Sequence, residues 1–202
     1  MNSHAVPERT LSLAMREHVM ASYSEKAQPY LDAIAAAVFS QEDVRNWLLA
    51  GTTHETAYSN AKCLDAEQKA CRGKTRQPFY CNYWCFWCER AGNCGIRFDG
   101  SRPLETDMMA FLESGEGRRL AIHIEFKHDG EALRTGQAEA YPLRAECWAR
   151  NRQRPRSVMA HDDWLTVIFC GDDAKDSPEV VPFERRISHS EARSMIERYP
   201  RS

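Results

Sequence analysis

Residues 120–127 alternate between apolar side chains and a mostly polar set, and this segment constrains the fold more than any other. A period of two is typical of a β-strand with one buried face. Glu125 and Lys127 then leave the sheet on the same face, opposite the apolar residues. The turn sequence Ser-Gly-Glu-Gly at residues 114–117 precedes this segment, so we predict a hairpin whose first strand covers residues 104–112.

The segments around this hairpin predict a small mixed sheet flanked by helices. Residues 164–170 (WLTVIFC) are almost entirely apolar and lie between acidic pairs, which is typical of a central strand buried on both faces. Residues 180–183 are predicted as an edge strand, and the capping-box sequence at residues 188–191 predicts a final helix. Together with helices before the hairpin, one of them over residues 54–71, this order indicates an α/β or α+β sandwich.

The character of the sequence divides the 202-residue chain into three parts. Residues 1–72 are predicted to be helical, residues 73–103 to form a cysteine-rich insertion, and residues 104–202 to form the core of the domain. No apolar run approaches the roughly 18 residues that a membrane-spanning helix requires, and the N-terminus lacks the pattern of a secretory signal. We therefore expect a cytoplasmic protein with no membrane segment.

Three ionisable residues on the hairpin carry the strongest chemical signal. Asp107 lies on the first strand, and Glu125 and Lys127 lie on the second. Two carboxylates supply the hard oxygen ligands that Mg²⁺ or Mn²⁺ prefers. A neighbouring lysine can orient an attacking water and offset negative charge on a phosphoryl group. The alternative is that these groups form an ordinary solvated strand face.

These residues resemble the motifs of the PD-(D/E)xK nuclease superfamily. Asp107 matches its acidic position, and residues 124–127 (IEFK) match its (D/E)xK strand. Residues 137–141 (QAEAY) resemble the QxxxY motif of the RecB-like branch, and residues 51–54 (GTTH) resemble its glycine–histidine motif with one residue fewer. The resemblance implies a restriction-endonuclease-like sandwich that hydrolyses phosphodiester bonds in nucleic acid, with DNA favoured over RNA and 5′-phosphate products.

The resemblance also implies a role for each matched residue. Lys127 would position the attacking water, while Gln137 and Tyr141 would orient metal-bound groups or the nucleic-acid backbone. A purely structural role is the alternative for the histidine of the GTTH segment. The groups that would bind Mg²⁺ or Mn²⁺ are Asp107, Glu125, the Phe126 carbonyl and His54.

Five arginines and a tryptophan follow the QxxxY segment and suggest a local nucleic-acid contact. The net charge of −2 provides no general basic field, so such a contact has to come from local charge. Arginine with an interleaved aromatic residue suits phosphate binding and base stacking, although a solvated loop is the alternative. The predicted contact residues are Arg144, Trp148, Arg150, Arg152, Arg154 and Arg156.

The cysteines are strongly clustered, since six of the eight fall between Cys63 and Cys94. Thiolates this close together can fill the coordination sphere of zinc or of a [4Fe–4S] cluster, and either would be structural. Part of the spacing resembles the iron–sulfur staple of some RecB-like nucleases, where it follows the QxxxY helix instead of preceding the hairpin. Disulfides are the remaining alternative. The predicted ligands are Cys81, Cys85, Cys88 and Cys94, with Cys63 or Cys71 as substitutes for the first.

The sequence therefore favours a metal-dependent nuclease that acts on DNA. A second function is a catalytically inactive nucleic-acid-binding or adaptor protein with a structural zinc or iron–sulfur module. A third is a secreted protein stabilised by disulfides. A protein partner is not indicated by any motif.

Overall fold

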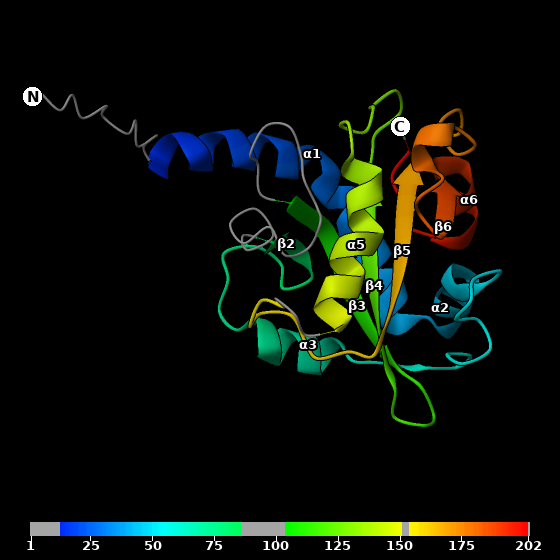
Figure 1. Ribbon diagram of the computed structural model, residues 1–202. Coiled ribbons are helices and arrows are strands. Elements are labelled where there is room, and N and C mark those ends of the chain that lie inside the picture. Colours follow the sequence, from blue (N-terminus) through cyan, green and yellow to red (C-terminus); the bar gives the residue numbers. More distant parts are fainter. Residues whose placement is uncertain (1–12, 86–103, 151–153, 202) are drawn as a thin grey trace, which may run out of the picture.

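A central mixed sheet with helices on both faces forms the body of the molecule (Figure 1). The computed structural model describes residues 13–85, 104–150 and 154–201. The mixed helix-and-sheet architecture predicted from the sequence is confirmed at this level. Among these described residues, none of the helices combines the length and the apolar character that crossing a membrane requires.

Four adjacent strands form most of the sheet. β3 (Leu104–Glu113) and β4 (Arg119–Phe126) are antiparallel neighbours. β5 (Asp163–Cys170) lies parallel to β4, and β6 (Arg185–Ser188) lies parallel to β5. The hairpin and the buried central strand predicted from the sequence are therefore confirmed. Two short strands, β1 (Lys62–Cys63) and β2 (Cys81–Cys85), both pair antiparallel with β3.

Helices cover both faces of this sheet. α1 (Leu13–Ser40), α2 (Glu42–Leu49) and α6 (His189–Met195) contribute to the larger core, which takes every second side chain of β4 and β5. α5 (Gln137–Ala149) covers the opposite face, and α3 (Asp65–Arg72) also contacts β3. In Figure 1, α5 crosses in front of the sheet while the end of α1 passes behind it.

The segment predicted as a helix over residues 54–71 is mostly loop, which corrects that prediction. Turns continue to residue 60, and α3 begins only at Asp65. Asn60 has a φ of 57°, in the left-handed region, which ends any helical run before it. The Tyr58 hydroxyl donates to Asp163 Oδ2 at 2.6 Å, and this bond holds the loop against the start of β5.

The edge of the sheet also differs from the prediction. Residues 180–183 do not form a strand, because a 3₁₀ helix (Pro178–Val180) ends at the first of them and a turn follows; β6 is the edge strand instead. Proline at the first turn favours a helical start, since its φ is already fixed and it has no N–H to leave unpaired. The capping box that starts the last helix is confirmed by reciprocal bonds between Ser188 and Glu191.

β2 falls inside the segment predicted as a separate insertion, but it belongs to the main sheet. Asn82 has a φ of 56°, which interrupts the alternation of side chains along the strand. Cys81 therefore packs in the larger core, whereas Tyr83 and Cys85 pack in the core beneath α5. This interruption explains why the sequence shows no period of two here. Residues 81–85 of the predicted insertion therefore join the main sheet, and the insertion as a whole stays a prediction, because residues 86–103 lie outside the described residues.

The left-handed backbone at Asn82 yields a stability prediction. This conformation costs most residues with a Cβ about 1–2 kcal/mol, and asparagine tolerates it better than most. We expect Asn82→Val to lower the free energy of unfolding by about 1–2 kcal/mol, while Asn82→Gly stays within about 0.5 kcal/mol of wild type. Urea unfolding followed by circular dichroism measures both variants. Equal losses would mean that the amide, not the backbone conformation, stabilises this strand.

Candidate functional site

A buried carboxylate at the end of β4 is the centre of the candidate site. Glu125 is 1% exposed and Lys127, one residue beyond the strand, is 5% exposed. Ile124 and Phe126 enter the larger core, so the two charged side chains face α5. The strand period thus leads both side chains to the helix-covered face, as the sequence predicts.

Two side chains donate hydrogen bonds to the Glu125 carboxylate, and a third forms an ion pair with it. Gln137 Nε2 lies 2.6 Å from Glu125 Oε1, and the Tyr141 hydroxyl donates to Oε2. Lys127 Nζ lies 3.0 Å from Oε1 and 3.4 Å from Oε1 of Glu131. Because Gln137 and Tyr141 are four residues apart, one face of α5 presents both donors. The structure therefore brings the QxxxY pair and the ExK strand together at one carboxylate.

The Tyr141 hydroxyl is held in its neutral, donating form. Its side chain is fully buried, and burial raises the pKa of Tyr141 well above the ordinary tyrosine value. The negative charges of Glu125 and Asp107 raise this pKa further. Tyr141 consequently stays protonated near neutral pH and acts there as a hydrogen-bond donor.

Asp107 lies beside this carboxylate, on β3. Its Oδ2 accepts a hydrogen bond from the Phe126 main-chain N–H at 2.9 Å. The side chain keeps part of its surface exposed, yet burial raises the pKa of Asp107 well above its usual value, and the charges of Glu125 and Glu105 raise it further. Burial, followed by the charge of Glu125, also raises the pKa of Glu105 to about 7. Three carboxyl groups therefore repel one another at this end of the sheet.

This mutual repulsion fits a divalent cation. Asp107 and Glu125 supply two hard oxygens, and the Phe126 carbonyl directly follows Glu125 in the chain. Across residues 13–85, 104–150 and 154–201, no three or more His, Cys, Asp or Glu side chains are grouped as metal ligands. Two carboxylates with the other positions left to water and substrate suit Mg²⁺ or Mn²⁺ better than the closed ligand sets of structural zinc.

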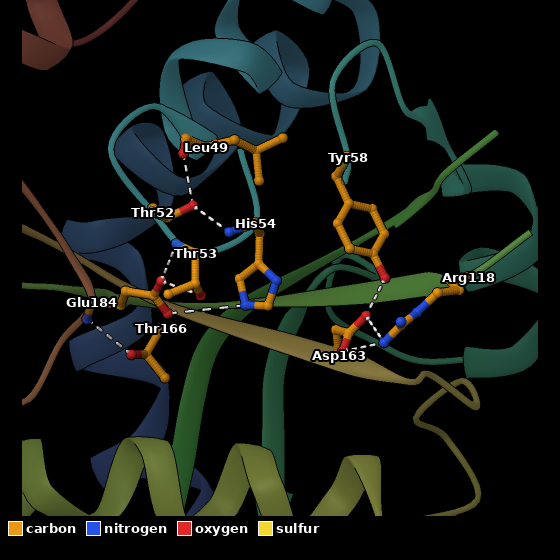
Figure 2. Close-up of polar contacts among 9 residues, drawn as sticks. All are labelled: Leu49, Thr52, Thr53, His54, Tyr58, Arg118, Asp163, Thr166 and Glu184. Atoms are coloured by element: carbon orange, nitrogen blue, oxygen red, sulfur yellow. Dashed lines mark hydrogen bonds and ion pairs between the residues drawn. The ribbon is translucent and has the colours of Figure 1, made fainter. Parts of the chain in front are cut away.

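His54 lies apart from these carboxylates, so its predicted role as a metal ligand is not supported. Its Nε2 is directed at Glu184 and lies 4.0 Å from Oε2, while its ring is near that of Tyr58 (Figure 2). Tyr58 is bonded to Asp163, the first residue of β5, whereas Glu125 pairs near the other end of that strand. The distance along the strand separates the histidine from the carboxylate.

The GTTH segment has a structural explanation instead. Thr52 Oγ1 donates to the Leu49 carbonyl at 2.7 Å and accepts from the His54 N–H at 3.2 Å. The Thr53 N–H and hydroxyl both donate to Glu184 Oε1 at 2.8 Å (Figure 2). These contacts close the loop after α2 and tie it to the connection between β5 and β6.

Arg144 and Trp148 are buried, which corrects their predicted role in nucleic-acid binding. Arg144 Nε donates to Thr106 Oγ1 at 3.0 Å, Nη2 donates to the Glu105 carbonyl at 2.9 Å, and the guanidinium lies over the Tyr141 ring. Trp148 is fully buried. Positions 137, 141, 144 and 148 recur at helical spacing, so these side chains all lie on the inner face of α5.

For the other arginines of this stretch, contact with nucleic acid stays a prediction. Arg150 is 54% exposed and pairs with Glu146 at 2.7 Å. Arg156 is exposed and Arg154 is partly exposed. Arg152 lies outside the described residues. A phosphate contact from this end of α5 and the loop after it is compatible with these positions, and it remains a prediction.

Two of the four predicted cysteine ligands are described, and they do not share a core. Cys81 packs with the residues of α1 and Cys85 packs on the opposite face of the sheet. Burial raises the pKa of the Cys81 thiol to about 12, which opposes the thiolate form that a metal binds. A shared metal would require one side chain to leave its core. Cys88 and Cys94 lie outside the described residues, so the zinc or iron–sulfur site remains a prediction.

Two carboxylates at the site belong to none of the predicted motifs. Glu105 lies two residues before Asp107, and the period of a strand could have identified it. Glu131 contacts Lys127 Nζ and also accepts from the His128 N–H at 3.1 Å, so it closes the loop after β4. The contact between Glu131 and Lys127 is seen only in the folded loop, because the residues between 127 and 131 show no helical pattern that would place the two side chains together.

Comparison of the chain with protein-family models, with curated proteins and with solved structures finds no match. The function is therefore inferred from the geometry of Glu125 and its neighbours.

The burial of Arg144 predicts a loss of stability when it is replaced. Removing a buried charged donor leaves Thr106 Oγ1 and the Glu105 carbonyl without their bonds, so Arg144→Met should lower the free energy of unfolding by about 3 kcal/mol. The exposed Arg150→Gln should change it by about 0.5 kcal/mol or less. Urea unfolding measures both. If Arg144→Met also flattened the salt dependence of nucleic-acid binding by a folded protein, Arg144 would contact phosphate after all.

The raised pKa values predict how a divalent cation acts on stability. Asp107 and Glu105 are easier to bury as neutral acids. Their contribution to the free energy of unfolding is therefore greatest below the pKa of the unfolded state. It is lost as the pH rises through the pKa of the folded state, which is about 7 for Glu105. Mg²⁺ or Mn²⁺ should replace this loss by binding the charged form. At a hundredfold excess over its Kd the cation should stabilise the fold by about 2.7 kcal/mol at pH 8 and by much less at pH 5.5.

Thermal unfolding of metal-free protein with and without the cation measures this effect. Asp107→Asn should remove the response, while Glu116→Gln in the exposed β3–β4 turn should keep it. A response that is equal at the two pH values would argue against binding at the carboxylates.

Proposed function

We propose that this chain is a divalent-metal-dependent nuclease that hydrolyses phosphodiester bonds, with DNA as its substrate. One observation carries the proposal: Glu125 is held by Lys127, Gln137 and Tyr141 at a single buried point, with Asp107 beside it. A carboxylate pair next to a lysine suits phosphoryl-transfer chemistry because it combines metal ligands with a positive charge.

The arrangement of elements supports a restriction-endonuclease-like sandwich as the finer fold class. The hairpin of β3 and β4 is followed by α5 as a crossover and by β5 parallel to β4. In this order Asp107 and Glu125 come from neighbouring strands at the same end of the sheet, beneath the helix that donates to Glu125. We propose this class on the connectivity and on the position of the carboxylates within it.

Each residue at the site then has a defined task. Asp107, Glu125 and the Phe126 carbonyl would hold the cation, which would polarise a phosphoryl oxygen and make the attacking water more acidic. Lys127, fixed between Glu125 and Glu131, holds its ammonium where it orients the attacking water and offsets negative charge on the phosphoryl oxygens.

The roles of Gln137 and Tyr141 follow from what they contact. Both donate to Glu125, so they fix the orientation of this carboxylate. The alternative task, contact with the nucleic-acid backbone, has less support because both side chains are buried. A carboxylate that cannot rotate keeps its ligand oxygens in place, so its side chain loses little rotational entropy when the cation binds.

The proposal predicts which substitutions abolish cleavage. Asp107→Asn, Glu125→Gln and Lys127→Met should each lower the rate of Mg²⁺- or Mn²⁺-dependent DNA cleavage by about a thousandfold or more, because each removes a metal ligand or the charge beside it. End-labelled single- and double-stranded DNA and RNA substrates, separated on denaturing gels, measure the rate and identify the 5′-phosphate product. The control Glu116→Gln should cleave like wild type.

A second function is favoured by the two hydrogen bonds that the Glu125 carboxylate accepts. Both oxygens of Glu125 already accept hydrogen bonds from the protein, which suits a nucleic-acid-binding or adaptor protein that no longer cuts. In that case the wild type binds nucleic acid with an affinity that falls with salt, and no divalent cation induces cleavage. Cleavage by the wild type that survives in Lys127→Met would contradict the assignment of the site.

A further inference from the structure

The main chain at Lys127 is held from both sides just after β4 ends. Its N–H donates to the Phe169 carbonyl on β5 at 2.9 Å. Its carbonyl lies 2.9 Å from Nε2 of His189, the first residue of α6. His189 is 2% exposed and is adjacent in sequence to none of the residues at the site. A helix at the far end of the chain is thus bonded to the residue that carries the ammonium group.

The hydrogen-bond network determines the tautomer of His189. A carbonyl oxygen only accepts, so Nε2 must carry the hydrogen that it shares with Lys127. In the neutral ring Nδ1 then accepts, and its partner at 2.8 Å is the Tyr199 hydroxyl. Asp129 Oδ1 is 3.9 Å from Nε2, beyond hydrogen-bond distance. Burial lowers the pKa of His189, which favours this neutral form.

Contacts on every side fix the His189 ring. The capping box formed by Ser188 and Glu191 fixes the first turn of α6. It therefore fixes the backbone position of His189, the first residue of that helix. The ring of Phe126 lies 5.4 Å from the His189 ring between centroids, and the Tyr199 ring lies at 5.8 Å. Because these contacts hold the ring and the tautomer is determined, the imidazole donates to the Lys127 carbonyl through Nε2 in a fixed geometry.

We infer that His189 is a positioning residue for Lys127, acting through the chain of hydrogen bonds from Tyr199 to His189 to the Lys127 carbonyl. The inference rests on the proposed nuclease function, because it gives α6 and the C-terminal residues a task in that site. Lys127 follows the last residue of β4, and the bond from its N–H to the Phe169 carbonyl ties its main chain to β5. The bond from His189 holds the other peptide group of the same residue, through the Lys127 carbonyl.

A pair of amide variants separates this role from simple packing. The glutamine side chain places its NH₂ near the position of His Nε2, whereas asparagine reaches only as far as Nδ1. His189→Asn should therefore lower kcat by about tenfold or more with KM for DNA nearly unchanged, since small displacements of a catalytic group act on the chemical step. His189→Gln should stay within about threefold of wild-type kcat.

Hydrogen exchange at the Lys127 amide provides a readout that does not require activity. In metal-free protein, His189→Asn should exchange this amide faster than wild type, and His189→Gln should remain close to wild type. Tyr199→Phe is the milder variant, since it removes only the hydroxyl that orients the ring. It should speed exchange and lower kcat by a factor of about two to five, so the inference can be tested even if His189→Asn does not fold.

Three outcomes decide between the alternatives. If Asn and Gln at position 189 lower kcat equally, or if neither variant changes kcat or Lys127 exchange, His189 does not position Lys127. If the wild type cleaves no nucleic acid but the exchange pattern is as expected, the positioning stands and the nuclease proposal fails. If the wild type cleaves and Tyr199→Phe matches it in both readouts, the hydrogen-bond chain has no role while the nuclease proposal stands.

Discussion

The burial of the Glu125 carboxylate is the constraint on which the rest of the structure depends. A buried charge is strongly destabilising unless donors surround it, and the donors here come from two elements: Lys127 at the end of β4, and Gln137 and Tyr141 on α5. Satisfying this one group therefore determines how α5 lies on the sheet. Stability and the candidate chemistry share the same contacts, which explains why so many polar side chains are buried at this end of the molecule.

The inner face of α5 carries further buried polar and aromatic side chains beyond those that contact Glu125. Below Gln137 and Tyr141, Arg144 bonds to β3 and Trp148 fills the core. All four positions follow helical spacing, so a motif of two residues is part of a stripe of four. The charge of Arg144 and the aromatic ring of Trp148 suggest nucleic-acid contacts. Their helical spacing from Gln137 and Tyr141 instead places both on the buried face of α5. The residues of the stretch that do face solvent come at the end of the helix and beyond it.

The opposite face of the sheet is linked to the same site. α6 reaches the Lys127 carbonyl through His189, and the larger core behind it contains Phe126. The period of two along β4 sends Glu125 one way and Phe126 the other, so a single strand end connects both cores. Where this period fails, at Asn82, cysteines four residues apart pack on opposite faces. Spacing in the sequence thus measures proximity only where the backbone is regular.

Local patterns determined the hairpin, the central strand, the capping box of α6 and the pairing of Glu125 with Lys127 on one face. Each of these depends on neighbours within a few residues, so the sequence alone contains the information. Tertiary structure decided the rest: that His54 turns to Glu184 instead, and that His189 meets Lys127. These contacts join residues far apart in the chain, and only the packing of helices on the sheet determines which of them meet.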